Sequence, residues 1–270
     1  MRLRVVSAPP FGAAPDPAVS EVVWRDNEGR VAAYGATAGS LHRMRMPGLA
    51  TFAWRDGSDE VMAESADAAH DAVVDAFQRC VLPMALHTRG LQVLHASAVR
   101  GTHGVLALCG PSGTGKSTLA YGLARRPGHI LWADDAVAFD ATEDPVRAVP
   151  LPFSMHLRQA SADYFGTARA GPSTIAADPA PLEAVFVLER AAAGEEPSVR
   201  ATRLAAAGAF TAVLEHAYCF DLEGRPRRRE TAEQYLDLTA RVPVYRLSFR
   251  PGLEGLPAIL DTIERIAAGG

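Results

Sequence analysis

The sequence predicts an α/β fold with a small β-rich lobe at its N-terminus, and three observations support this prediction. An apolar strand pattern at 105–109 runs directly into a glycine-rich loop and then into a helix pattern at 117–126. Strand and helix patterns continue to alternate toward the C-terminus, as is typical of a sheet covered by helices. Residues 1–64 instead hold short strand-like stretches between turn signals.

The chain of 270 residues is long enough for a main domain with a small appendage. We expect the β-rich lobe to span 1–64, a linking helix to lie within 65–90, and the main domain to occupy 91–270. Repeated prolines predict an irregular region at 138–181. The other expected elements of the main domain are strands at 91–99, 130–133, 182–188 and 242–249, and helices at 204–220, 231–240 and 256–267.

Composition limits the classes of function. The net charge is −4 and no basic face is evident, so we expect no nucleic-acid partner. Apolar runs stop well short of the ~18 residues that a membrane helix needs, so we expect no membrane association. The three cysteines are far apart and form no metal or redox motif. Such a sparse set is typical of a cytoplasmic protein with thiols buried as small apolar groups.

The clearest motif is Gly-x-x-x-x-Gly-Lys-Ser, placed between the predicted strand and the predicted helix. Glycines let the N–H groups of such a loop turn toward phosphate oxygens, and the helix presents its positive end to the same anion. The motif predicts a site for a nucleoside triphosphate with Mg²⁺, in which the lysine contacts the phosphates and Ser117 ligates the metal ion. The residues expected to bind the nucleotide are Gly110, Pro111, Ser112, Gly113, Thr114, Gly115, Lys116, Ser117 and Thr118.

Lys116 is the only lysine among 27 basic residues. The chain therefore uses arginine wherever either side chain serves, and its one lysine is expected where a compact ammonium group is needed. The same count argues against a GTPase. The Asn-Lys-x-Asp element that reads guanine needs a second lysine, and Asn27 is the only asparagine.

Asp134 and Asp135 end the strand that follows the loop and its helix. In an open α/β sheet, ligands gather at the carboxyl ends of strands, so both carboxylates are expected near the terminal phosphate. One of them would hold Mg²⁺, and the other would orient or deprotonate an attacking hydroxyl group. A purely structural cap at the end of the strand is the alternative interpretation.

Three other features have both a functional and a purely structural interpretation. His95 lies on the strand before the loop, where a lone histidine is more often a structural residue. The cluster Arg225-Pro-Arg-Arg-Arg229 is predicted to lie in a loop, where it would close over the triphosphate, receive an acidic peptide end, or simply be solvated. Arg158 is a weaker candidate of the same kind.

The block from Leu94-His95-Ala-Ser-Ala through the glycine loop to Ala133-Asp-Asp-Ala-Val137 resembles the bacterial HPr serine kinase family. The resemblance covers 91–137 and is looser toward the C-terminus. It implies a P-loop fold of the phosphoenolpyruvate-carboxykinase-like type and transfer of the γ-phosphate of ATP to a serine hydroxyl. The Glu-x-Arg-Gly signature of full-length HPr kinase/phosphorylases does not occur at 139–158. The short β lobe looks more like the HPr-kinase-like proteins that phosphorylate lasso-peptide precursors.

By position, the resemblance implies that Asp134 is the catalytic base, that Asp135 is its acidic partner at the metal ion, and that His95 is the active-site histidine. Lys116 completes the expected catalytic set. ATP and Mg²⁺ are the implied cofactors, and a peptide or protein with an acceptor serine is the implied partner. A homo-oligomer is also implied, because HPr kinases are similar in forming one. Two alternatives stay open: a small-molecule kinase, and an ATP-binding sensor without transfer chemistry.

Overall fold

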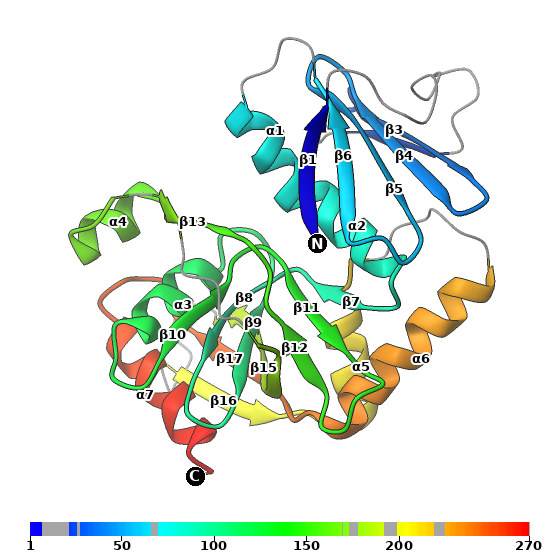
Figure 1. The fold of residues 1–270 in the computed structure, drawn as a ribbon. Coiled ribbons are helices and arrows are strands. Elements are labelled where there is room, and N and C mark those ends of the chain that lie inside the picture. Colours follow the sequence, from blue (N-terminus) through cyan, green and yellow to red (C-terminus); the bar gives the residue numbers. More distant parts are fainter. Residues whose placement is uncertain are drawn as a thin grey trace. The chain divides into compact units, whose positions relative to one another are not determined.

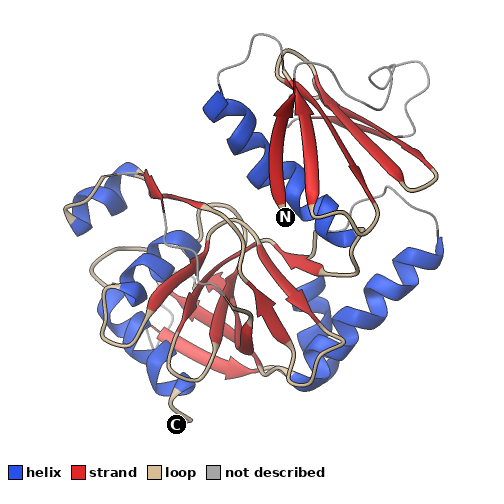
Figure 2. Cartoon of the chain, viewed as in Figure 1, coloured by secondary structure: helices blue, strands red, loops and turns tan. Residues whose placement is uncertain are grey.

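The computed structural model describes residues 1–6, 22–25, 28–65, 70–168, 170–172, 178–191, 199–218 and 225–269, with the backbone alone at 170–172 and 225–228. The fold is mixed α/β (Figures 1 and 2). It divides into two compact units. The first comprises Met1–Leu91 with Cys219–Arg229, and the second comprises Gln92–Tyr218 with Glu230–Gly270.

The first unit contains a six-stranded sheet in the order β1-β6-β5-β4-β3-β2. Only the β1–β6 pair is parallel. Met44, Phe52 and Ala63 are cross-strand neighbours on one face, and all three are buried. The strands are β1 (Arg2–Val6), β2 (Val22–Arg25), β3 (Val31–Ala38), β4 (Leu41–Met46), β5 (Ala50–Arg55) and β6 (Glu60–Glu64).

The helical segment expected at 65–90 is observed as α1 (His70–Ala76), a π-helical turn η1 (Phe77–Val81) and α2 (Leu82–His87). It groups with the N-terminal sheet in the first unit. Pro83 lies in the first turn of α2, where its ring removes one hydrogen bond from the continuing helix. The π turn immediately before it is the kind of local adjustment that accommodates such a break.

The second unit is built on a nine-stranded sheet in which β9, β15 and β17 run parallel. Its main path is β10-β8-β9-β15-β12-β11-β7, and β17 pairs with both β15 and β16. The strands are β7 (Gln92–Leu94), β8 (Ala96–Arg100), β9 (Val105–Cys109), β10 (Ile130–Ala133), β11 (Val137–Asp140), β12 (Arg147–Val149), β15 (Ala180–Arg190), β16 (Val199–Arg203) and β17 (Val244–Phe249). The helices are α3 (Lys116–Ala124), α4 (Gln159–Phe165), α5 (Ala206–Leu214), α6 (Arg225–Arg241) and α7 (Leu256–Ala267).

Strand β9 is buried on both faces, which makes it a central strand of a three-layer arrangement. Leu106 and Leu108 face a core that contains residues of α3 and α7. Val105 and Ala107 face a second core that contains residues of α5 and α6. Figure 1 shows these two pairs of helices on opposite faces of the sheet. The carboxyl end of β9 is therefore held from both sides where the glycine loop begins.

Three expectations about elements need correction. The region 138–181 is not irregular throughout, because it contains α4, β11, β12 and a two-stranded sheet of β13 (Ser154–His156) and β14 (Ala170–Pro172). The helix expected at 204–220 ends at Leu214, and Ala217 forms a β-bridge with Leu94 instead. Residues 225–229 are the first residues of helix α6 rather than a loop.

Cys109 is buried, as expected, and burial raises the pKa of its thiol to about 12. Cys80 is exposed on η1, so the expectation that every thiol is buried is wrong there. Cys219 lies outside the described residues. No helix within the described part of the chain is both long enough and apolar enough to span a bilayer.

Two glycines provide a matched test of the second unit. A Cβ added at Gly104, in the turn between β8 and β9, would lie 2.5 Å from the carbonyl oxygen of Pro181. A Cβ at Gly208, within α5, would meet no atom within 4 Å. We expect Gly104→Ala to lower the free energy of unfolding by about 1–3 kcal/mol. Gly208→Ala should raise it by roughly 0.5–1 kcal/mol. Denaturant titration followed by circular dichroism measures both, and equal effects would contradict the close approach at Gly104.

Candidate functional site

The loop between β9 and α3 has the backbone conformation that its glycines permit. Gly110, Gly113 and Gly115 have φ angles of 154°, 84° and 111°. L-residues with a Cβ rarely adopt such angles. Gly115 caps α3, and no side chain caps that helix end. The first N–H groups of α3 are therefore left to bind a ligand, and the N-terminus of a helix favours an anion.

Lys116 is folded back into its own loop. Its side chain is buried, and its Nζ donates hydrogen bonds to the carbonyl oxygen of Gly110 at 2.8 Å and to that of Pro111 at 3.4 Å. Burial lowers the pKa of this ammonium group, while the charge of Asp135 acts in the opposite direction. This cation lies beside strand-end carboxylates and a glycine loop. Its ammonium group can therefore bind phosphate oxygens in place of the loop carbonyl oxygens.

The carboxylate of Asp134 accepts hydrogen bonds from groups on three different elements. Its Oδ1 accepts hydrogen bonds from the hydroxyl groups of Ser97 at 2.7 Å and Ser117 at 2.8 Å. Its Oδ2 accepts the backbone N–H of His156 at 3.1 Å. Burial raises the pKa of Asp134, and the hydrogen bonds from the two serines oppose that shift. The carboxylate is therefore placed directly against the serine that was expected to ligate the metal ion.

Asp135 has a different environment from its neighbour. It is only half-buried, and it is the only non-glycine residue with a positive φ in the described ranges, at 65°. A left-handed conformation costs an L-residue free energy, and such strain tends to persist at functional sites. The conformation turns the backbone at this point, and the Asp135 carbonyl oxygen then accepts hydrogen bonds from the ring of His95 and the hydroxyl of Tyr218.

His95 lies between the lysine and the second aspartate. Its Nδ1 is 3.1 Å from the carbonyl oxygen of Asp135, which can only accept, so Nδ1 carries the proton. Its Nε2 is then free to accept from Lys116 Nζ at 3.2 Å. Burial lowers the pKa of His95, and the nearby Lys116 charge lowers it further. Tyr218 supports the ring edge-on, with ring centroids 5.8 Å apart. The neutral ring therefore connects Lys116 to the backbone of Asp135.

Two arginines flank the loop. A Cβ at Gly113 would lie 2.9 Å from a guanidinium nitrogen of Arg158, so that side chain packs directly against the glycine. Arg190, at the end of β15, donates a hydrogen bond to the carbonyl oxygen of Gly113. Both arginines are exposed. Guanidinium groups at this position are available to phosphate or carboxylate groups of a ligand.

The structure thus brings Lys116, Ser117, Asp134, Asp135 and His95 together. The remaining loop residues occupy the turn itself. Two of their hydroxyl groups already have partners, because Thr114 bonds to the carbonyl oxygen of Pro111 and Thr118 bonds to Ser161 of α4. Ser112 is exposed. The side chains of 225–228 in the arginine cluster lie outside the described part of the chain.

Sequence reasoning missed four contributors: Ser97, Arg190, His216 and Tyr218. Ser97 was expected to be an ordinary structural residue of its strand, but its hydroxyl donates a hydrogen bond to Asp134. His216 and Tyr218 were assigned to a helix that ends before them. The exposed strand-end Arg190 carries no local sequence signal that would separate it from the other arginines.

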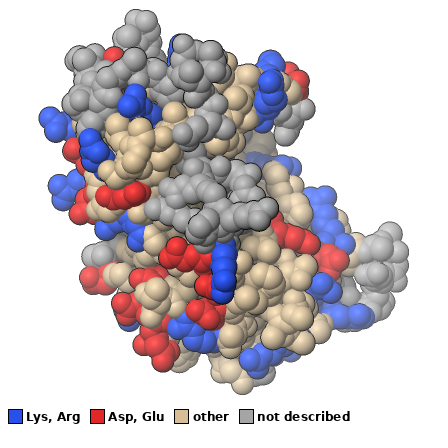
Figure 3. Space-filling model, turned by 90° about the vertical axis from the view of Figure 1, so that its right-hand side faces the viewer, with Lys and Arg blue, Asp and Glu red and all other residues tan. Residues whose placement is uncertain are grey.

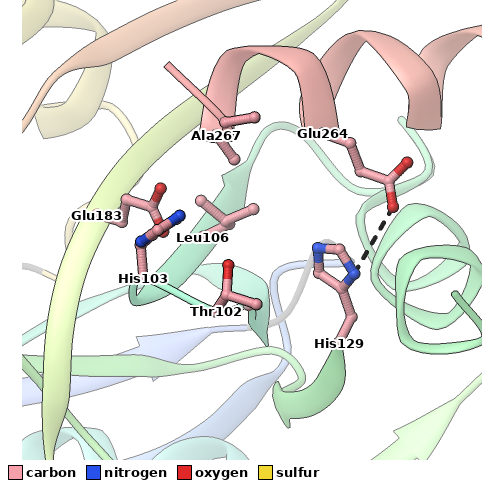
Figure 4. A pocket seen from close by; sticks show the side chains of 9 residues that line it. Thr102, His103, Leu106, His129, Glu183, Glu264 and Ala267 are labelled. Carbon is pink, nitrogen blue, oxygen red and sulfur yellow. Dashed lines mark ion pairs between the residues drawn. The ribbon is translucent and has the colours of Figure 1, made fainter. Parts of the chain in front are cut away.

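A cavity of about 170 Å³ lies at the other end of β9. Figure 4 shows His103, Glu183 and His129 at its wall, with Glu264 of α7 beside His129. Its lining includes Gly101, Thr102 and His103, which precede β9, and Leu106 near the start of that strand, whereas the glycine loop follows the end of the strand. The cavity is therefore separate from the lysine and aspartate cluster.

Acidic and basic side chains are interspersed on the face shown in Figure 3. No three His, Cys, Asp or Glu side chains of the described ranges are grouped as metal ligands. Mg²⁺ in phosphate-transfer sites is commonly held by one or two carboxylates together with water and substrate oxygens. Ser117 and the aspartate pair are therefore the oxygen donors to consider here.

Comparisons with known proteins found matches among solved structures alone. No protein-family model matches the chain, and no curated protein matches it either. Among solved structures it is similar to the HPr(Ser) kinase/phosphatase from Coxiella burnetii, with 13% sequence identity and a TM-score of 0.36. That similarity covers 66% of this chain and 92% of the other. A score this low carries no argument about activity, so we derive the function from the side chains of the site.

The left-handed conformation of Asp135 gives a stability test that is independent of any activity. Asp135→Gly and Asp135→Ala both remove the carboxylate, but only glycine adopts a φ of 65° without strain. We expect the glycine variant to be more stable than the alanine variant by about 1 kcal/mol, as measured by denaturant unfolding. The same pair at Asp140, in strand β11, should show the opposite order. Equal stabilities at position 135 would contradict the strained backbone.

Proposed function

We propose that this chain is an ATP- and Mg²⁺-dependent kinase of the HPr serine kinase-like type, with a P-loop core. In this proposal it transfers the γ-phosphate to a serine hydroxyl of a peptide or protein, in particular a lasso-type precursor peptide. The observation that carries the proposal is the pairing of Ser117 Oγ with Asp134 Oδ1 at 2.8 Å, at the start of the helix that also carries the buried Lys116.

The loop fits a triphosphate in its backbone and its charge. Three glycines with positive φ shape a concave turn, and the uncapped N-terminus of α3 adds N–H donors. Lys116 Nζ now bonds to carbonyl oxygens of the loop, and phosphate oxygens would replace those acceptors. Arg158 and Arg190 add cationic groups at the rim, where they would bind the outer phosphate oxygens.

The oxygen donors fit Mg²⁺. A serine hydroxyl and two adjacent carboxylates form a hard-ligand set of the kind this ion prefers. Ser117 and Asp135 are the proposed ligands, and Asp134 bonds to the Ser117 hydroxyl. When bound, the ion would neutralise charge on the phosphate oxygens and hold them in place.

The chemistry assigned to this chain's residues is proton transfer and electrostatic stabilisation. The acceptor hydroxyl oxygen bonds to the γ-phosphorus as the bond to the β–γ bridging oxygen breaks, and ADP leaves with that electron pair. Asp134 accepts the hydroxyl proton, for which its raised pKa makes it a stronger base than an ordinary aspartate. Lys116 stabilises the charge on the transferring group, and His95 holds Lys116 against the backbone of Asp135.

The acceptor in this proposal rests on the sequence resemblance at 91–137. A small-molecule kinase would use the same lysine, serine and aspartates, so these residues support phosphate transfer in general. The peptide acceptor is therefore tested separately from the transfer chemistry.

The first test concerns Lys116. We expect Lys116→Met and Lys116→Arg each to reduce transfer of labelled phosphate from ATP by on the order of a hundred-fold or more. Methionine removes the charge, and the larger planar guanidinium does not fit the buried position. Transfer to a synthetic peptide ending in serine is measured by mass spectrometry, and ATP binding by calorimetry. Arg30→Met, at an exposed ion pair in the first unit, is the control and should leave both unchanged.

The outcomes separate the three functions. Phosphate on the peptide supports the proposal. Phosphate on a metabolite but on no peptide favours a small-molecule kinase. Tight ATP binding with no transfer to any acceptor favours a sensor. If the wild-type chain binds no ATP, or if Lys116→Met binds it normally, the proposed site is wrong.

The second test separates the two aspartates. We expect Asp134→Asn to lower kcat by about 10²–10⁴-fold at every Mg²⁺ concentration, as loss of a general base does. Asp135→Asn should mainly raise the Mg²⁺ concentration needed for half-maximal rate. Because transfer needs ionised Asp134, kcat/KM of the wild type should fall as pH drops through a pKa that lies above the ordinary value of 3.8. This acid limb should be absent from Asp134→Asn.

The contact between Ser117 and Asp134 also favours a second arrangement, in which Asp134 serves the metal ion and Asp135 accepts the proton. Recovery of Asp134→Asn by excess Mg²⁺, with no recovery of Asp135→Asn, would show that reversed arrangement.

A further inference from the structure

A second histidine lies against the site, and its position follows from strand pairing. Leu94 and Ala217 form an antiparallel bridge, the N–H of His95 donates to the carbonyl oxygen of His216 at 2.7 Å, and the N–H of Tyr218 donates to that of Val93. His95 and His216 are therefore directly opposite each other. Side chains at opposed positions of an antiparallel pair project from the same face. The His216 side chain thus accompanies His95 on the face that holds the site.

Most of the His216 side chain is covered, but its ring nitrogens are not among the described buried atoms that lack a hydrogen-bond partner, so solvent or a ligand can reach them. The residue is 9% exposed, and no described side chain or backbone group bonds to its ring nitrogens. Ring nitrogens that no described group occupies and that remain accessible are open to a hydrogen bond with a bound ligand. The charged and titratable groups that act on it are Lys116, Glu215 and His95. Burial lowers the pKa of His216, with Lys116 the next largest cause.

The surroundings select the kind of ligand. The charge of Lys116 acts on His216, and Tyr218, two residues further along the chain, packs against the ring of His95. A metal cation is disfavoured next to an ammonium group, whereas an anion gains from its charge. A neutral imidazole still provides one N–H donor, so it can bond to an anion without first taking up a proton.

We infer that His216 is a phosphate-binding residue, whose ring N–H donates a hydrogen bond to the terminal phosphate group held by Lys116. This inference rests on the proposed function, because it takes the ligand of Lys116 to be ATP. The terminal phosphate is favoured over the inner ones because His95, the cross-strand neighbour of His216, bridges Lys116 and Asp135 at the reacting end of the site.

The experiment compares two nucleotides that differ only at the terminal position. We expect His216→Leu to weaken binding of the non-hydrolysable analogue AMP-PNP by about ten- to hundred-fold, as loss of a hydrogen bond to a charged group does. Binding of ADP should change little, so the ratio of the ADP dissociation constant to the AMP-PNP dissociation constant should fall by about the same factor. His216→Gln retains an N–H donor and should recover part of that ratio. A structural role alone would weaken both nucleotides equally.

His129→Leu is the matched control, because that histidine lines the separate cavity at the other end of β9. It should leave the ratio of AMP-PNP to ADP affinity unchanged. An unchanged ratio in His216→Leu would overturn the inference, as would an equal loss for both nucleotides.

A measurement on the wild-type chain covers the case in which His216→Leu does not fold. In ¹⁵N spectra of the histidine rings, the His216 signals should shift when AMP-PNP is added and should shift much less with ADP. Identical shifts with the two nucleotides overturn the inference. Failure of the proposed function gives a different result, because AMP-PNP would then bind equally well to wild type and to Lys116→Met.

Discussion

The site depends on one buried carboxylate, that of Asp134. Its two oxygens accept hydrogen bonds from Ser97 on β8, from Ser117 on α3 and from the backbone N–H of His156 on β13. Removing a carboxylate from water costs several kcal/mol, and only such bonds make the position tenable. The same bonds fix where α3 begins relative to β8 and β10. The start of α3 then determines where Lys116 lies.

Lys116 and His95 extend this arrangement across the sheet. The ammonium group is shared between the loop carbonyl of Gly110 and the ring of His95, and that ring is anchored by the backbone of Asp135. Adjacent aspartates therefore serve the site through different groups, Asp134 through its side chain and Asp135 partly through its carbonyl oxygen. This division explains the positive φ at Asp135, because the turn that it makes presents the carbonyl oxygen to His95.

The sequence was sufficient for the parts of the fold and site that are local. The strand before the loop, the glycines and the helix after it form one continuous segment, and each has its own pattern, so 105–126 could be predicted. His216 and Tyr218 could not be predicted, because their role comes from a bridge to β7 that is more than a hundred residues distant in the chain. The apolar pattern at 204–220 continues past the end of α5, and pairing with β7 overrides it. The short strands at 138–181 depend on their partners in the same way.

The positions that break general rules of folding gather at the carboxyl end of β9 and its neighbours. A left-handed aspartate, a buried lysine and a buried carboxylate each cost free energy, and the fold alone requires none of them. Cys109, at the end of the same strand, shows what burial does without such a role, because its thiol is held neutral in an apolar core. The contrast within a few residues indicates that the costly groups are retained for a ligand. In the proposed function, their cations and hydrogen-bond donors would bind a triphosphate, and the two carboxylates would serve Mg²⁺ and the acceptor hydroxyl group.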